Sequence, residues 1–415
     1  MRVQQAQYDQ AFWAWFTPIS VTGLFGGPTP EAYGNSQYLR TEASLQGDSN
    51  IGKPGFYAGY RVEGAIPLFT FGKLYNLRHA AASGVDIARD NTLRVQNELR
   101  ANVSRGFLGY TLAASFLALV DDTDKIISDA ISQAQDMIKK KSDQVSDSDI
   151  YMLRTLLGQL RARRAEAQQG ADEAKELLRF LMNLDADDAF MLDTADLDLP
   201  AIAPKKSRDF EDYAQRNRPE TRMAANAIKA RDSAVNIRLG FLFPDLLLAG
   251  FITQNYTSNQ DFQRNPFLVN AGVDFTGGVA LAARYTLDIP TKLAQMREAK
   301  AELHKAELDQ ELLQKGVLLQ VRKAFADSLG AWGQAAEYQK AEKSGKSWVV
   351  SSTLNFESGL APANELFQAI RAFSESGAAR RKAQFDFGMA RVGLAEALGA
   401  DLKTLNDLWR DSAKE

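Results

Sequence analysis

Apolar and polar side chains alternate from Gly55 to Ile66, and this stretch leads directly into a very long helical pattern. The even positions carry the bulkier apolar groups, whereas the odd positions are small or polar, a period of two that is typical of a sheet with one wetted face. Pro67 lacks a backbone N–H and is expected to end the hydrogen-bond ladder. From Lys73 the period becomes helical and holds to about Lys141. A strand that opens a helix this long is unusual in globular enzymes.

A second helical pattern, from Ile150 to Leu184, follows the polar break SDQVSDSD. Its inward positions step by four and three: Leu153, Leu157, Leu160, Arg164, Ala167, Ala171, Ala174, Leu178 and Leu181. Small alanines at these positions allow close helix approach. The two helices therefore predict an antiparallel coiled-coil hairpin.

The second half of the chain repeats this order of elements. It predicts a helix, an extended segment, a strand and two further helices, at 219–238, 246–256, 271–289, 292–355 and 364–398. The anchors that pair across the halves are Pro18 with Pro244, Ile66-Pro67 with Ile289-Pro290, and the LDAD at Leu184 with the LGAD at Leu398. The predicted organisation is repeat 1 at 1–186 (strands about 18–68, hairpin about 72–184), a connector at 187–216, repeat 2 at 217–401 (strands about 245–289, hairpin about 292–398) and a tail at 402–415.

Each repeat supplies two strands, and four strands neither close a barrel nor form a stable open sheet with one apolar face. Three copies would pool twelve strands into a barrel with an apolar outer wall, and a cyclic trimer is a permitted closed symmetry. The predicted fold class is thus mixed and mainly α: tandem repeats of two strands and a long helical hairpin, with a β-barrel continued by an α-helical barrel. Because each outgoing helix is longer than its return helix, residues 1–16 and 219–241 are expected to stack end to end with the return helices.

Composition narrows the function classes. A net charge of −3 gives no support for nucleic-acid binding, and a chain without cysteine has no disulfide or thiolate site. The only histidines, His79 and His304, lie in polar helical patterns and are interpreted as surface residues. We expect no metal site, no cofactor and no catalysis. The aspartates between 185 and 198 lack the spacing of a calcium loop and predict a solvated connector.

No run of 18 apolar residues exists, so the sequence predicts no transmembrane helix, and Phe107–Val120 is interpreted as a buried helix segment. The polar start MRVQQAQYDQ is not a signal peptide.

Several short motifs together resemble the TolC family of outer-membrane efflux and secretion channels. They are IPLFTFGK at 66–73, LFPDLLLAG at 242–250, FESGLAPANELFQA at 356–369 and LAEALGAD at 394–401. Each is weak alone, but their order and duplication cover essentially the whole chain. The second strand-to-helix joint, DIPTKLAQ at 288–295, departs from the pattern of the first because it lacks its Phe and Gly.

The resemblance implies a passive outer-membrane exit duct that spans into the periplasm of a Gram-negative cell. Such a duct serves a tripartite efflux pump or a type I secretion system and carries drugs, proteins or metal ions from periplasm to exterior. The implied partners are two further copies of the chain, a periplasmic adaptor protein, an inner-membrane pump and outer-membrane lipid. Projecting Pro219 onto the first repeat places its counterpart before Met1, so a signal peptide and a first helix are expected to be missing.

The resemblance also implies site residues. Glu365 occupies the position of an acid that constricts the periplasmic entrance, Gln368 replaces a second acid, and Asp149 aligns with Glu365 across the repeats. The alternative for both acids is an ordinary residue of a helix N-terminus, where a carboxylate favours the dipole. Asp143 and Asp147 are further acids of the first tip. The family's gating Arg and Tyr positions read Ala361 and Phe356 here, which indicates that other contacts hold this entrance.

The exposed hairpin tips are the predicted adaptor contacts: Val145, Ser146 and Asp147, and Ser358, Gly359 and Leu360. Lys139–Lys141 is interpreted as a solvated run. The predicted strand–helix joint comprises Pro67, Phe69, Phe71 and Gly72, with Pro290 as its second copy, and the two phenylalanines are expected at the membrane–water boundary.

Two other functions remain open. A periplasmic adaptor also carries helical hairpins, but it has one hairpin flanked by a lipoyl-like domain. A cytoplasmic coiled-coil scaffold would accept the missing signal peptide but would leave the amphipathic strands unexplained.

Overall fold

The computed structural model describes residues 1–16, 18–29, 55–139, 145–185, 188, 190–193, 199–204, 206–258 and 273–414. It divides into two compact units, residues 1–89 with 224–308 and residues 90–223 with 309–415. Helices α2, α5 and α6 contribute residues to both. Asp143, Lys140, Lys141 and the loops predicted at 47–54 and beyond Ser258 lie outside the described residues.

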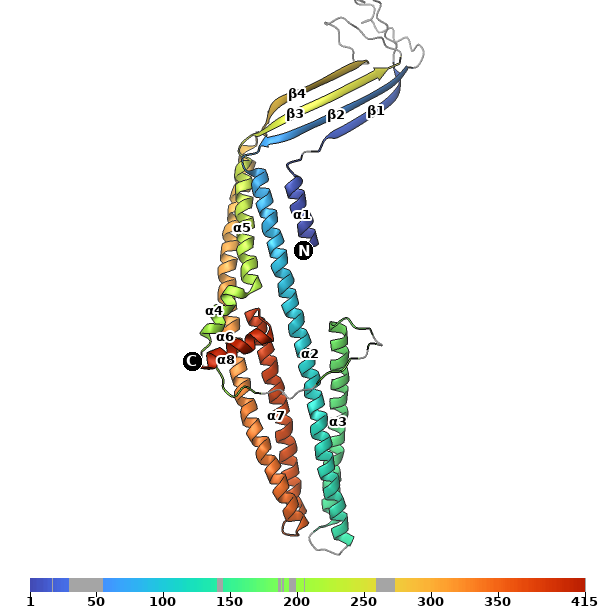
Figure 1. Cartoon of the computed structure of the whole chain (residues 1–415), viewed down its shortest axis with the longest axis vertical. Helices are drawn as coiled ribbons and strands as arrows, with labels where there is room; N and C mark the ends of the chain where they lie inside the picture. Colours follow the sequence, from blue (N-terminus) through green and yellow to red (C-terminus); the bar gives the residue numbers. More distant parts are fainter. Residues whose placement is uncertain are drawn as a thin grey trace, which may run out of the picture. The chain divides into compact units, whose positions relative to one another are not determined.

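The first unit contains a four-stranded antiparallel sheet in the order β1-β2-β3-β4 (Figure 1). Its strands are β1 Ser20–Thr29, β2 Gly55–Phe69, β3 Asp245–Thr257 and β4 Asp274–Arg284. The central pair, β2 with β3, has continuous register from Tyr57–Thr257 to Pro67–Leu247. Both predicted strand pairs are therefore present, and the two repeats meet along this central pairing.

The pairing register assigns every strand residue to one of two faces. One face carries large exposed apolar side chains from all four strands: Val21, Phe25, Phe56, Tyr60, Ile66, Leu246, Leu248, Ile252, Tyr256, Phe275, Val279 and Leu281. The other carries Thr22, Arg61 and Glu63 with Thr253, Asn255 and Thr276. The alternation predicted from the sequence is confirmed, and a bare apolar sheet face is exposed by the single chain.

Two joints connect this sheet to helices, and their strand ends differ from the prediction. Pro67 is buried and does not end β2, which continues to Phe69 after an irregularity in register. A proline is tolerated where the ladder is interrupted. The fourth strand ends at Arg284, not near Ile289, because Pro290 lies in the first turn of the next helix, where its missing N–H costs nothing.

The second unit is built on two helical hairpins (Figure 1). The helices of the chain are α1 Arg2–Trp13, α2 Lys73–Lys139, α3 Asp147–Leu181, α4 Arg208–Asn217, α5 Pro219–Gly240, α6 Ile289–Glu357, α7 Ala363–Leu398 and α8 Leu402–Lys414. In the first hairpin, α2 and α3 pack through small residues: a side chain added at Gly106 would meet Leu178 at 3.1 Å. Leu153, Leu160, Ala171 and Leu178 are buried, as the predicted heptad face of α3 requires. Arg164 of the same series is exposed and pairs with Asp121 of α2.

The hairpins also pack on each other, since α7 contacts α2 through glycines. Gly377 abuts Leu119, and Gly388 abuts Leu108. A core of Leu119, Val120, Ile127, Leu153, Leu366, Ile370 and their neighbours joins α2, α3, α6 and α7. Among the described helices, α2 alone has a window with the length and hydropathy of a membrane span. Only 33% of that window is buried, and most residues of Phe107–Val120 are half-buried, so the prediction of a helix segment buried all round holds only in part.

Two helices were not predicted, α4 inside the connector and α8 inside the tail. They pack together and bury Phe210, Leu405 and Trp409 against α6 and α7. Glu211 of α4 accepts two hydrogen bonds from Arg322 of α6, at 3.0 and 2.9 Å. The Trp409 and Trp332 indoles donate to backbone carbonyls of the connector. The connector and tail are thus folded against the second hairpin.

Candidate functional site

At the tip of the first hairpin, the predicted acid Asp149 has a local structural role. Its carboxylate accepts hydrogen bonds from the backbone N–H and the hydroxyl of Ser146, at 2.9 and 2.8 Å, and so forms a capping box at the start of α3. Ser146 and Asp147 are exposed, but Val145 is buried beside Ile150. Val145 was therefore wrongly placed among the exposed tip residues, because an apolar residue next to a cap packs against the first turn of the helix.

The tip of the second hairpin is a tight turn after α6. Gly359 adopts a φ of 72°, which an L side chain disfavours, and the backbone N–H groups of Leu360 and Ala361 donate to the carbonyl of Asn355. Leu360 is 80% exposed, whereas Ala361 and Phe356, the positions of the family's gating residues, are buried. Ser358 is exposed as well and Gly359 is half-buried, so this tip is accessible, and its contact with an adaptor stays a prediction.

Glu365 and Gln368 follow on α7. Glu365 is half-buried and accepts a long hydrogen bond of 3.5 Å from the buried Ser352 hydroxyl of α6, while Gln368 is exposed. Near this tip Gln133 of α2 donates to Glu357 of α6 at 2.8 Å, which links the two hairpins. Asp149 and Glu365 are held by different partners, so a shared aperture remains a prediction.

The first strand–helix joint is closed by a side-chain cluster (Figure 1 shows its place between β2 and α2). Phe71 and Gly72 both have positive φ, 48° and 81°, which turns the chain from strand to helix. Phe71 stacks on Phe243, with ring centroids 4.9 Å apart, and contacts Phe69 edge to face. Of the predicted joint residues, Phe69 and Phe71 are thus in direct contact.

A buried ion pair, which the sequence did not predict, fixes the same joint. Lys73 opens α2 and binds the carboxylate of Asp245 in β3 at 2.8 Å, with side-chain exposures of 11% and 19%. Its ammonium also donates to the Phe243 carbonyl and lies over the Phe241 ring. Gly240 completes the contact, since a Cβ there would lie 2.9 Å from the Phe71 carbonyl oxygen. The first joint of repeat 1 is therefore locked to the helix–strand joint of repeat 2.

The second joint is built differently, since none of its residues has the positive φ of Phe71 and Gly72. Lys292 donates to the Thr286 carbonyl and lies 4.0 Å from the centroid of the Tyr285 ring. With Pro290 in the first helical turn, this contact replaces the Phe and Gly of the first joint.

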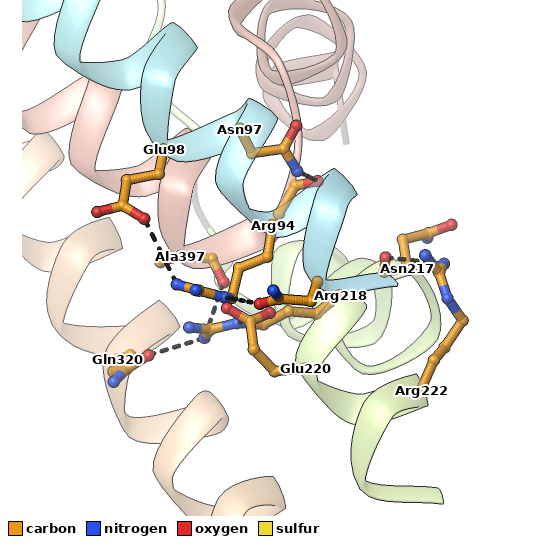
Figure 2. A network of polar contacts seen from close by, with 11 residues as sticks. Arg94, Asn97, Glu98, Asn217, Arg218, Glu220, Arg222, Gln320 and Ala397 are labelled. Atoms are coloured by element: carbon orange, nitrogen blue, oxygen red, sulfur yellow. Dashed lines mark hydrogen bonds and ion pairs between the residues drawn. The ribbon is translucent and has the colours of Figure 1, made fainter. Parts of the chain in front are cut away.

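A polar network holds the start of α5 on the end of α7 (Figure 2). Arg218 donates to the Ala397 carbonyl at 3.3 Å and to the Gln320 amide oxygen at 2.7 Å, and it pairs with Glu220. Asn97 donates to the Gly399 carbonyl at 3.0 Å. A Cβ at Gly399 would lie 3.0 Å from Pro219, so the first residue of α5 abuts the end of α7.

The described residues contain no group of three or more His, Asp or Glu side chains that could hold a metal ion. Ionic clusters instead connect helices. Glu342 of α6 binds both Arg380 and Arg381 of α7, and Arg381 also donates to the Ser115 carbonyl of α2 at 2.8 Å. Burial raises the pKa of Glu342, but the hydrogen bonds from the two guanidinium groups outweigh it and hold this pKa below its usual value.

No protein-family model matches the chain, and no curated protein matches its sequence. Comparison with solved structures finds the same fold over nearly the full length. The outer-membrane channel OprN matches with a TM-score of 0.72 and 16% identity, over 97% of this chain and 85% of that one. CusC, whose structures are described in terms of transmembrane channel formation, matches with a TM-score of 0.73 and 16% identity, over 96% of this chain and 87% of that one.

The outer membrane protein VceC of Vibrio cholerae gives a TM-score of 0.71 and 13% identity over 97% of this chain and 91% of that one. These structures are TolC-family outer-membrane channels. At such identities the likeness concerns the fold, so the fold that the sequence motifs resembled is confirmed: the chain has the TolC-type arrangement of strands and helical hairpins.

Proposed function

We propose that the chain is one protomer of a homotrimeric outer-membrane channel, a passive exit duct from periplasm to exterior. The observation that carries this proposal is the sheet. Its apolar face exposes Phe275, Val279 and Leu281 by 68 to 78%, which is unfavourable in water and suited to a lipid environment. The opposite face is small and polar, as the wall of a water-filled lumen requires.

The edges of the sheet support ring closure. Strands β1 and β4 each have a neighbour on one side only within the described chain. Pairing β4 of one copy with β1 of the next is a heterologous contact, which closes into a ring when the rotation fits. Three copies would give twelve strands, an even number as in bacterial outer-membrane barrels.

The helices also expose apolar side chains that a neighbouring copy could cover. On α6 these are Leu308, Leu312 and Leu319, and on α3 they are Tyr151, Leu177 and Phe180. Open faces on the two outermost hairpin arms are what a ring of hairpins needs, because each α6 would pack on the α3 of the next protomer.

The finer assignment concerns the partners. We propose that the tips, with exposed Ser146, Asp147, Ser358 and Leu360, contact a periplasmic adaptor, and that an inner-membrane pump or type I secretion system supplies the cargo. In a trimer Glu365 would contribute three carboxylates near the axis and favour cations. A Glu365→Gln channel with unchanged conductance and cation preference would remove this residue from the pore.

The test is expression in a Gram-negative host with an added signal peptide, followed by membrane fractionation, a heat-modifiable trimer band on a gel, and conductance in planar bilayers. Outer-membrane trimers that conduct ions are expected. Recovery as a soluble monomer without conductance would contradict the channel and favour the adaptor or scaffold function.

A further inference from the structure

The polar face of the sheet carries an aromatic and ionic cluster at mid-strand. Arg61 and Glu63 of β2 form an ion pair with Nε and Oε2 2.8 Å apart, and the Arg61 guanidinium lies 5.8 Å from the ring centroid of Phe251 in β3. In register, Glu63 is directly opposite Phe251, and Arg61 is opposite Thr253. The three side chains therefore project from adjoining positions of one face.

Phe251 is out of place on this face. The other strand residues whose large apolar side chains are exposed lie almost entirely on the apolar face, apart from Leu24. Phe251 is 41% exposed although its side chain covers Gly278, its partner in β4. The ring packs on Gly278 and beside Arg61, yet 41% of its surface stays exposed on the polar face, away from the lipid side.

The neighbours of this cluster are small. The next row of the same face toward the joint consists of Ala65, Ala249 and Ala280. Together with the cluster they line a hollow of about 490 Å³. On the polar face, the side chains therefore change from a row of three alanines to the large ring of Phe251 in the next row.

We propose that Phe251, Arg61 and Glu63 form a three-fold ring that narrows the barrel lumen and contacts amphiphilic cargo, which carries an apolar part and a charge. This inference rests on the proposed trimeric channel. Strands about 4.8 Å apart and tilted by about 40° give twelve strands a radius of about 12 Å. A phenylalanine reaches inward by about 5 Å, so three rings would occupy a large share of that radius.

In each protomer the positive charge of Arg61 balances the negative charge of Glu63. Neutralising one or the other therefore gives two variants whose rings have opposite net charge. Arg61→Gln would leave three carboxylates, and Glu63→Gln would leave three guanidinium groups. In bilayers with a KCl gradient, the reversal potentials of these two channels should shift in opposite directions from wild type, toward cations for Arg61→Gln and toward anions for Glu63→Gln. Equal reversal potentials for all three channels would overturn the charged ring.

The absence of cysteine makes single-cysteine labelling clean. In membrane-inserted trimers, the Phe251→Cys variant should react with a small, charged, membrane-impermeant methanethiosulfonate, and the reaction should lower its conductance by at least a third. Ile252→Cys, the neighbouring position on the apolar face, is the matched control and should stay unreactive.

Reaction at position 252 but not at 251 would overturn the face assignment, and reaction at 251 without loss of conductance would overturn the constriction. These results differ from failure of the proposed function, in which the wild-type protein itself would form no channel.

Discussion

The buried cluster at Glu342 allows a prediction with an internal control. Glu342 receives Arg380 at 2.5 Å and Arg381 at 2.7 Å, and the three side chains are only 12 to 23% exposed. Glu342→Gln keeps the shape but leaves two guanidinium groups buried without a carboxylate. Removing one partner of a buried ion pair costs about 3 kcal/mol or more. We expect the local opening of α6 from α7 to become easier by this amount.

The first hairpin supplies the control. Arg164 follows Asp149 on α3 at the same distance along the sequence as Arg380 follows Glu365 on α7. The two arginines therefore hold corresponding positions on their return helices. Near it, Asp124 of α2 pairs with Arg161 at 2.8 Å, with the Arg161 side chain 61% exposed and that of Asp124 26% exposed. Exposed pairs contribute about 0.2–1 kcal/mol. Asp124→Asn therefore removes an ion pair of similar geometry at a small cost.

Native-state hydrogen exchange measured by mass spectrometry compares the two variants. A cost of about 3 kcal/mol corresponds to an acceleration of about 100-fold in peptides around residues 335–349 and 376–388. Asp124→Asn should accelerate exchange of its own hairpin by less than about 5-fold. Equal and small effects in both variants would refute the argument that burial, and not the ion pair itself, sets the magnitude.

Four further predictions follow from the same reasoning. The pKa of Glu342 is lower in the folded chain than its usual value of 4.5. The ionised carboxylate therefore contributes its full stabilisation above pH 4.5, and this stabilisation is lost as the pH falls below that value. The difference in hydrogen exchange between wild type and Glu342→Gln should shrink in that acidic range. Gly399 has a φ of +68° and lies against the first turn of α5, so Gly399→Ala should lower the free energy of unfolding, measured with denaturant, by about 1–2 kcal/mol. Gly393 has open space around it, so Gly393→Ala should not lower this free energy. Lys73→Met should leave the Asp245 carboxylate with only the Arg284 guanidinium, 3.9 Å away, and lower the midpoint of thermal unfolding by several degrees. Trp409→Ala should cost about 3 kcal/mol and speed limited proteolysis of α8.

The long helices were predictable because their apolar period persists over many turns. Helix α6 was expected at 292–355 and spans Ile289–Glu357, so the pattern located it within a turn at each end. The short helices α4 and α8 were missed, although Leu402, Leu405 and Trp409 have helical spacing. Over so few residues that pattern competes with the surrounding Asp and Pro, and only packing against α6 and α7 makes it stable.

The candidate site was predictable only in part. The joint residues Phe71 and Gly72 are adjacent in the sequence, so a local pattern identified them. The Lys73–Asp245 pair and the Glu342 cluster join residues that are separated along the chain, and their contact depends on the register between elements, which a local sequence pattern does not show. Asp149 illustrates the opposite case, because an ordinary acid of a helix N-terminus was already the alternative given for it.

The end of each return helix shows how the duplicated architecture persists without sequence identity. The residue with positive φ after α7 is Gly399, and after α3 it is Asn183, with a φ of 54°. Asn183, and not Asp185 of the LDAD motif, is therefore the counterpart of Gly399. Asparagine and glycine share little except tolerance of the left-handed conformation that ends a helix. The requirement conserved between the halves at this position is thus a backbone geometry. The two joints differ, because Phe71 and Gly72 of the first joint have positive φ whereas no residue of the second joint, 285–292, does. A fold specified in this way can be shared with channels of 13 to 16% identity, because each position constrains conformation and volume more strongly than residue type.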